Sequence, residues 1–68
     1  MASKPRLTLG SSVPAVKEWE RVLQLARLID MGDGSYGKDD VAATRQWQEL
    51  HGLDPSGVVD EATWEAVG

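Results

Sequence analysis

The sequence contains no cysteine and a single histidine among its 68 residues. The missing cysteines exclude disulfide bonds and cysteine-based zinc sites, and one histidine is too few for the usual zinc ligand sets. The aromatic residues are three tryptophans and one tyrosine. A chain of this length folds as one small domain that buries only about 60% of its unfolded surface, so its core depends on a few large side chains.

Long apolar stretches and an excess of positive charge are also missing. No run approaches the roughly 18 apolar residues of a membrane span. The basic residues Lys4 and Arg6 are not followed by the apolar segment of a signal peptide. The net charge of -4 argues against nucleic acid as a partner, because positive charge supplies most of the affinity for phosphate. We therefore expect no binding to nucleic acid or to membranes.

A short pattern occurs twice in the second half of the chain. The first copy is Asp33-Gly34-Ser35-Tyr36-Gly37 and the second is Ser56-Gly57-Val58-Val59-Asp60. Each copy has a glycine turn, a residue of buried type two positions later, and then a residue that starts a helix. The pattern therefore predicts a turn that leads into a helix, used twice.

The first helix is expected over residues 14–29. Pro14 suits its first turn, with Ser12 or Val13 at the cap position. Apolar side chains at three- and four-residue steps predict its inward stripe. They are Val16, Trp19, Val22, Leu23, Ala26 and Ile29.

The second helix is expected between two glycines, with Gly37 at its N-terminal cap and Gly52 just beyond its C-terminus. Asp39 and Asp40 place negative charge in its first turn, against the positive end of the helix dipole. Its inward face is expected to hold Val41, Ala43, Thr44, Trp47 and Leu50.

A last short helix, residues 61–67, is expected after Asp60 as its N-cap, with Trp64 and Val67 facing the core. Little of the chain remains for strands. The sequence thus predicts an all-α protein, a compact three-helix bundle with glycine-rich connecting loops. Residues 1–6 are expected to form a flexible N-terminal arm and residues 7–68 the domain.

Several stretches occur in an order and spacing shared with one known family. They are Leu9-Gly10-Ser11 with Pro14-Ala15-Val16-Lys17-Glu18, Asp33-Gly34-x-Tyr36-Gly37, Ala43, Trp47-Gln48, His51-Gly52-Leu53, and Gly57-Val58-Val59 with Ala62-Thr63-Trp64. Together they resemble the peptidoglycan-binding domain family, the small three-helix wall-binding module of amidases and phage lysins. The resemblance covers residues 7–67. Among the departures, Glu20 stands where the family commonly has glutamine, and Asp40 where it usually has threonine.

The resemblance implies a non-catalytic module that binds peptidoglycan through the glycan strand or the stem peptide. Binding in a shallow groove would be weak, and it would act by tethering a partner or by display of many copies. The residues expected in the groove are Tyr36, Arg45, Gln48 and Trp64. No cofactor is implied. The expected location is extracellular, at the cell wall or on a phage particle, without a signal peptide of the chain's own.

Each groove residue also has a simpler interpretation. Trp64 can fill the core, as we expect for the other two tryptophans. Tyr36 is expected to bury its ring and keep its hydroxyl at the surface. Gln48 can hydrogen-bond loop backbone, such as the turn at 33–34, and Arg45 can be an ordinary solvated side chain.

Metal binding, catalysis and DNA binding find little support in the sequence. Gly32 and Gly34 fall where a calcium loop needs ligands. A three-helix domain of this size offers no deep cleft for paired catalytic carboxylates, so we expect no enzymatic activity. The helix after Pro55 carries acidic residues and no lysine or arginine, so it would repel phosphate.

A structural or interaction protein that reuses the same fold is the alternative function. The chain begins with Met1 and ends just after the last helix, as expected of a free-standing small protein or of an excised domain. Such a protein could decorate a phage capsid or tail. The basic arm Lys4-Pro5-Arg6 and an apolar patch would then dock on a protein surface. The partners expected under the two functions are thus a hydrolase or a phage structural protein.

Overall fold

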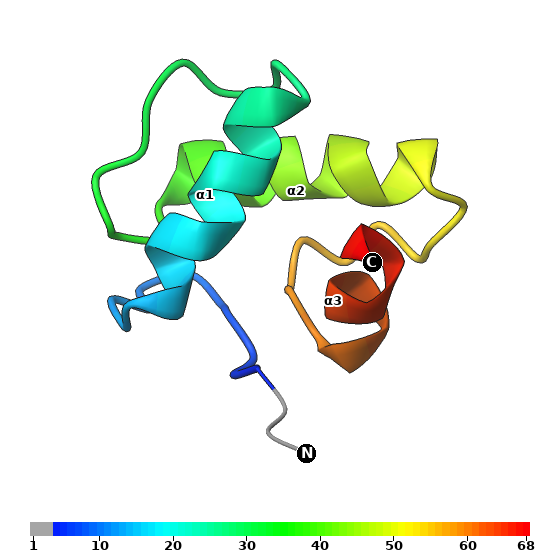
Figure 1. Ribbon diagram of the computed structural model, residues 1–68, viewed down its shortest axis with the longest axis horizontal. Helices are drawn as coiled ribbons and strands as arrows, with labels where there is room; N and C mark the ends of the chain where they lie inside the picture. Colours follow the sequence, from blue (N-terminus) through cyan, green and yellow to red (C-terminus); the bar gives the residue numbers. More distant parts are fainter. Residues whose placement is uncertain (1–3) are drawn as a thin grey trace.

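The computed structural model describes residues 4–68, so the first half of the predicted arm lies outside the described residues. Three helices follow one another along the chain: α1 (Ala15–Leu25), α2 (Lys38–Leu50) and α3 (Glu61–Val67). Figure 1 shows α1 crossing α2, with α3 beside both of them. Within residues 4–68 there is no strand, and the all-α three-helix prediction is confirmed.

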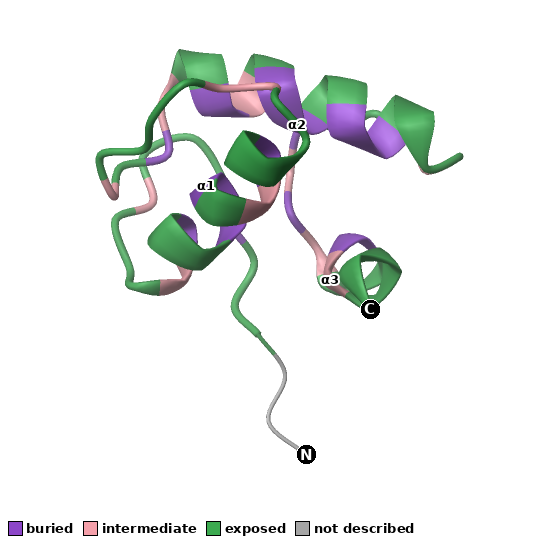
Figure 2. Cartoon of the chain, turned by 45° about the horizontal axis from the view of Figure 1, so that its top comes forward, coloured by how far each residue is buried: buried purple, intermediate pink, exposed green. Residues whose placement is uncertain are grey.

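The core lies where the three helices meet, and each of them contributes one tryptophan. Trp19 of α1 is fully buried. Its ring meets those of Trp47 and Trp64 edge-on, with centroid separations of 5.0 Å and 5.5 Å. Figure 2 shows that the buried faces of α1 and α2 point inward. The other buried apolar residues are Leu7, Val16, Leu23, Tyr36, Ala43 and Val59. The core positions predicted for Trp19 and Trp47 are confirmed.

The N-terminal segment connects the two copies of the repeated pattern. Leu7 exchanges two backbone hydrogen bonds of 2.9 Å with Val59 of the second copy. Tyr36 of the first copy is held in a similar way, because its N–H donates to Ser11 (2.8 Å) and its carbonyl accepts from Gly10 (2.9 Å). The residue two positions after each turn glycine is therefore buried against this segment. The repeat supplies two equivalent attachment points for the N-terminal chain.

The α1 helix ends at Leu25, earlier than the predicted residue 29. Arg27 adopts a left-handed φ of 61°. The N–H groups of Arg27 and Leu28 donate at 2.9 Å to the carbonyl oxygens of Gln24 and Leu23, which closes the helix end. This closure normally places glycine at the left-handed position, and the arginine found here gave no stop signal in the sequence.

Three further expectations about single residues are wrong. Pro14 itself occupies the N-cap of α1, without a side-chain hydrogen bond, so neither Ser12 nor Val13 caps that helix. Leu50 is 72% exposed, because the last turn of α2 extends beyond α1 (Figure 1). Val67 is 42% exposed, because the short α3 turns Thr63 and Trp64 toward the core instead.

The predicted caps of the other two helices are confirmed. Gly37 is the N-cap of α2, and Gly52 follows its last turn with a φ of 71°. The carboxylate of Asp60 caps α3 by accepting hydrogen bonds from the N–H (3.0 Å) and the hydroxyl (2.9 Å) of Thr63. These bonds favour the charged carboxylate and hold the pKa of Asp60 below its ordinary value.

Candidate functional site

Three of the four predicted groove residues meet around Gly57, the turn glycine of the second copy. The carbonyl oxygen of Gly57 lies 2.7 Å from the hydroxyl of Tyr36, and its N–H donates to Oε1 of Gln48 at 2.9 Å. The side chain of Arg45 lies over the same glycine, because a Cβ at Gly57 would be 3.1 Å from Nε of Arg45. The helix α2 supplies Arg45 and Gln48 from adjacent turns.

Gln48 is buried, and both ends of its amide are occupied. Besides accepting from Gly57, it donates through Nε2 to the carbonyl oxygen of Val58 (2.9 Å) and to Oγ1 of Thr63 (3.1 Å). Its hydrogen bonds are thus with the turn at Gly57 and not with the turn at 33–34. The side chain fixes the path of the second turn and the start of α3.

The hydroxyl of Tyr36 is buried, which corrects the expectation that it lies at the surface. It is 2.6 Å from Oγ1 of Thr44, which also accepts the indole N–H of Trp19 at 2.8 Å. Burial raises the pKa of Tyr36 to about 12. Tyr36 and Thr44 therefore join the N-terminal segment, α1, α2 and the second turn through one buried polar cluster.

Trp64 lies with the N-terminal arm. Its indole N–H donates to the carbonyl oxygen of Pro5 at 2.9 Å, and Nζ of Lys4 is 5.1 Å from its ring centre. Lys4 also forms a 2.6 Å ion pair with Glu18. No hydrogen bond within residues 4–68 joins Trp64 to Tyr36, Arg45 or Gln48. The structure therefore brings three of the four predicted residues together and places the fourth beside the arm.

A second pair of polar side chains, which the sequence analysis did not place in a site, supports the first turn. Glu20 is buried, and its Oε1 accepts the N–H of Gly34 at 2.9 Å, as Gln48 does for Gly57. Both residues directly follow a core tryptophan, so the repeated pairs Trp19-Glu20 and Trp47-Gln48 are the sequence signal for this role. A carboxylate, unlike an amide, only accepts hydrogen bonds, so Glu20 needs neighbouring groups that donate to it.

The neighbour of Glu20 is Asp40, whose Oδ1 accepts the N–H of Gly37 at 3.4 Å. Burial raises the pKa of Asp40 to about 7, and the hydrogen bond and negative charge of Glu20 add to this effect. Asp40 therefore keeps its proton at moderately acidic pH, where an ordinary aspartate has lost it. Within residues 4–68, no group of three or more acidic or histidine side chains is arranged to hold a metal ion.

Asp40→Asn is expected to remove a pH-dependent loss of stability. Between the ordinary pKa of 3.8 and the folded value of about 7, the folded protein keeps a proton that the unfolded chain has released. The free energy of unfolding therefore falls as the pH rises through this window, and the stabilising contribution is complete below it and lost above it. Asparagine has no charge to desolvate. Melting temperatures should be measured at several pH values. The melting temperature of the variant, relative to that of the wild type, should rise by a few degrees from the acidic to the alkaline end of the range. Parallel pH profiles of the two proteins would contradict the raised pKa of Asp40.

The fold and these contacts define a small three-helix module, in which two glycine turns are held by side chains from the helices before them. The chain belongs to the family described as "Putative peptidoglycan binding domain", whose model matches residues 12–67. Membership of this family supports a cell-wall binding module. No curated protein and no solved structure matches the chain. Within residues 4–68, every helix is too short or too polar to cross a membrane.

Proposed function

We propose that this domain binds peptidoglycan without catalysing a reaction, and that it holds an attached partner, or a particle carrying many copies, at the cell wall. The observation that carries the proposal is the family match over residues 12–67, which includes both turns and all four predicted groove residues. A single shallow site binds weakly, but attachment or repetition raises the effective concentration at the wall.

Exposure divides the four predicted residues into two roles. Arg45 is exposed and Trp64 half-buried, so we propose that these two contact the wall. A guanidinium group at Arg45 is suited to a carboxylate of the stem peptide, because its planar donors match both oxygens. Tyr36 and Gln48 are buried, and the geometry gives them the role of fixing the Gly57 turn under Arg45. Direct ligand contact by either of them stays a prediction.

The proposal is tested by co-sedimentation of the purified protein with purified cell walls. The wild type is expected to pellet, and Arg45→Ala should weaken binding about tenfold, as expected for a lost charged hydrogen bond. Arg21→Ala is the matched control, because it removes an exposed arginine from α1. Failure of the wild type to pellet with any wall type would overturn the proposed function. Equal effects of the two substitutions would overturn only the role of Arg45.

A phage structural role for the same fold has one supporting observation. Leu9 and Val13 are exposed apolar residues that follow the basic arm, so the N-terminal segment presents a small surface suited to another protein. This segment is also attached to the core through Leu7, so a docked partner would be held in one orientation relative to the domain. Genes for capsid or tail proteins beside this one would favour that role, whereas a hydrolase or lysis gene would favour wall binding.

A further inference from the structure

The N-terminal segment 4–6 lies across Trp64, one of the two residues to which we assign wall contact. The backbone carbonyl oxygen of Pro5 accepts the indole N–H of Trp64 at 2.9 Å, across 59 residues of sequence. Nζ of Lys4 lies over the indole ring, 5.1 Å from its centre. The segment therefore occupies both parts of Trp64 that can bind a ligand, the N–H donor and a ring face. We call residues 4–6 the strap.

The strap is attached to the domain at both of its ends. On its C-terminal side, Leu7 is fully buried and exchanges two backbone hydrogen bonds of 2.9 Å with Val59. At the other end, Nζ of Lys4 is 2.6 Å from Oε2 of Glu18 on α1. These two attachments hold the strap against Trp64 on α3.

The two attachments differ in strength. Leu7 belongs to the core, so its release would expose a buried side chain. The side chains of Lys4 and Glu18 are 52% and 58% exposed. An exposed ion pair shifts an equilibrium by about fivefold or less, and salt weakens it further. An exposed contact between a cation and an aromatic ring is of similar strength. The outer end of the strap can therefore leave Trp64 while Leu7 keeps its place.

We propose that the strap is an autoinhibitory segment, which must leave Trp64 before this residue contacts the wall. The inference rests on the proposed wall-binding function and adds a competition between the strap and the wall for one side chain. Only molecules with an open strap bind through Trp64, so the observed affinity is lower than the intrinsic affinity by the open fraction. Breaking the pair of Lys4 and Glu18 is therefore expected to strengthen wall binding, although it removes a contact from the fold.

Opening of the strap is measured first without any wall material, by NMR of the whole chain. Lys4→Gln and Glu18→Gln each break the ion pair. Both should shift the indole N–H signal of Trp64 and speed its exchange with solvent. The indole N–H of Trp19 is the internal reference, because it donates to Thr44 inside the core at 2.8 Å. An unchanged Trp64 signal in both variants would overturn the strap.

Co-sedimentation with purified cell walls then measures the inhibition. Both variants are expected to bind walls about threefold to fivefold more tightly than the wild type. The two substitutions change the net charge in opposite directions, so a general charge effect would strengthen binding in one variant and weaken it in the other. Tighter binding in only one variant, or in neither, would overturn the inhibitory role.

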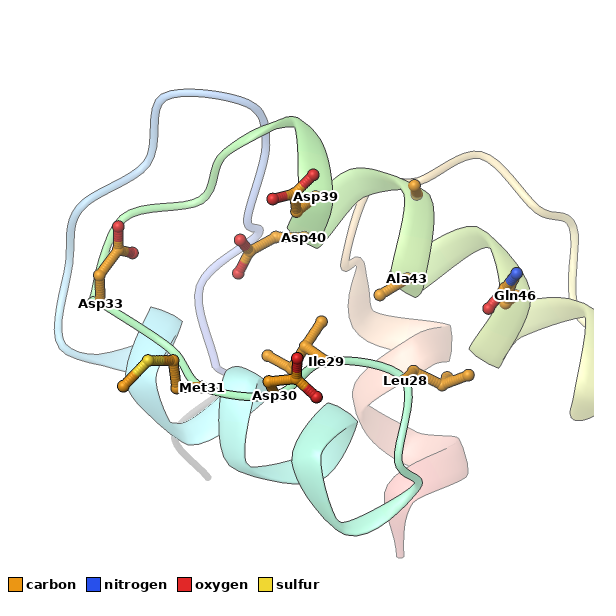
Figure 3. Close-up of a pocket in the computed structure, with 10 residues that line it drawn as sticks. Leu28, Ile29, Asp30, Met31, Asp33, Asp39, Asp40, Ala43 and Gln46 are labelled. Carbon is orange, nitrogen blue, oxygen red and sulfur yellow. The ribbon is translucent and has the colours of Figure 1, made fainter.

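Matched controls make the same changes of charge away from the strap. Lys38→Gln removes an exposed lysine at the start of α2, and Asp30→Asn removes an exposed carboxylate from the loop after α1. Figure 3 shows Asp30 at the pocket between this loop and α2, where the lining within residues 4–68 includes neither the strap nor Trp64. Both controls should leave the Trp64 signal and wall binding near the wild-type values. Equal strengthening of wall binding by the controls would overturn the inhibitory role.

Failure of the inhibitory role and failure of the proposed function give different results. If the wild type pellets with walls but the strap variants bind no more tightly, the wall-binding function stands and the autoinhibition is overturned. If the wild type and both strap variants fail to pellet with any wall type, the proposed function is wrong and the inhibitory role falls with it.

Discussion

Trp19→Ala is expected to abolish the cooperative folding of this protein at 25 °C. Trp19 is fully buried, meets the other two tryptophans edge-on, and donates to Thr44 at 2.8 Å. Truncation of a buried tryptophan costs about 3–5 kcal/mol. A domain of this size has a total stability of roughly the same magnitude. The substitution also leaves the hydroxyl of Thr44 without its indole donor inside the core.

Thermal unfolding followed by near-ultraviolet circular dichroism measures this effect. The variant should show no cooperative transition and should give a collapsed proton NMR spectrum. Trp64→Ala is the matched control, because Trp64 is half-buried and donates to an exposed part of the arm. That control should remain folded with a lowered melting temperature. A Trp19→Ala protein that melts cooperatively within about 5 °C of the wild type would contradict the central role of this residue.

Gly57→Ala is expected to destabilise the fold by about 2–5 kcal/mol, from two separate causes. The backbone at Gly57 has a φ of 81°, which is strained for any residue with a Cβ. The added Cβ would also lie 2.8 Å from Cγ1 of Val41 and 3.1 Å from Nε of Arg45. The turn would have to move away from α2 and release the hydrogen bond that Gly57 donates to Gln48.

Two other glycines separate strain from collision in this experiment. Gly52→Ala introduces a residue at a φ of 71° with no atom within 4 Å, so it carries the backbone strain alone. Gly34→Ala adds only a 3.2 Å contact with the flexible end of Lys17. Urea denaturation should therefore give losses of about 1–2 kcal/mol for these two variants and a clearly larger loss for Gly57→Ala. Equal losses for all three would show that the packing of the Gly57 turn against α2 contributes nothing.

The two copies of the repeated pattern are alike in construction but differ in chemistry. A side chain that follows a core tryptophan accepts the N–H of the turn glycine in each copy. The amide of Gln48 can donate as well, and it extends the contact to Thr63. The carboxylate of Glu20 cannot donate, and it lies beside Asp40. The same architecture thus produces a fully hydrogen-bonded turn in one copy and a charged, pH-sensitive turn in the other.

The sequence by itself determined the three helices and most of their ends, because these depend on local chemistry. Asp60 caps α3 through Thr63, and Gly52 ends α2 directly after its last turn. In both cases the interacting residues lie within a few positions of each other along the chain. The predicted end of α1 is wrong because the prediction relied on local signals, and the true end has none. Arg27 takes a left-handed conformation that its own side chain does not favour, so no local signal marked it.

Only the tertiary structure decided which side chains form the site. The hydroxyl of Tyr36 is buried because Thr44 and Gly57 lie beside it, and Gly57 is 21 residues away in the sequence. Gln48 serves the second turn, and Glu20 of α1 meets Asp40 of α2 only when the two helices pack together. Side-chain spacing along one helix is fixed by the helical repeat, whereas contacts between segments depend on how the whole chain packs. The sequence therefore determined the scaffold, and the packing determined which of its polar groups are occupied and which remain available to a ligand.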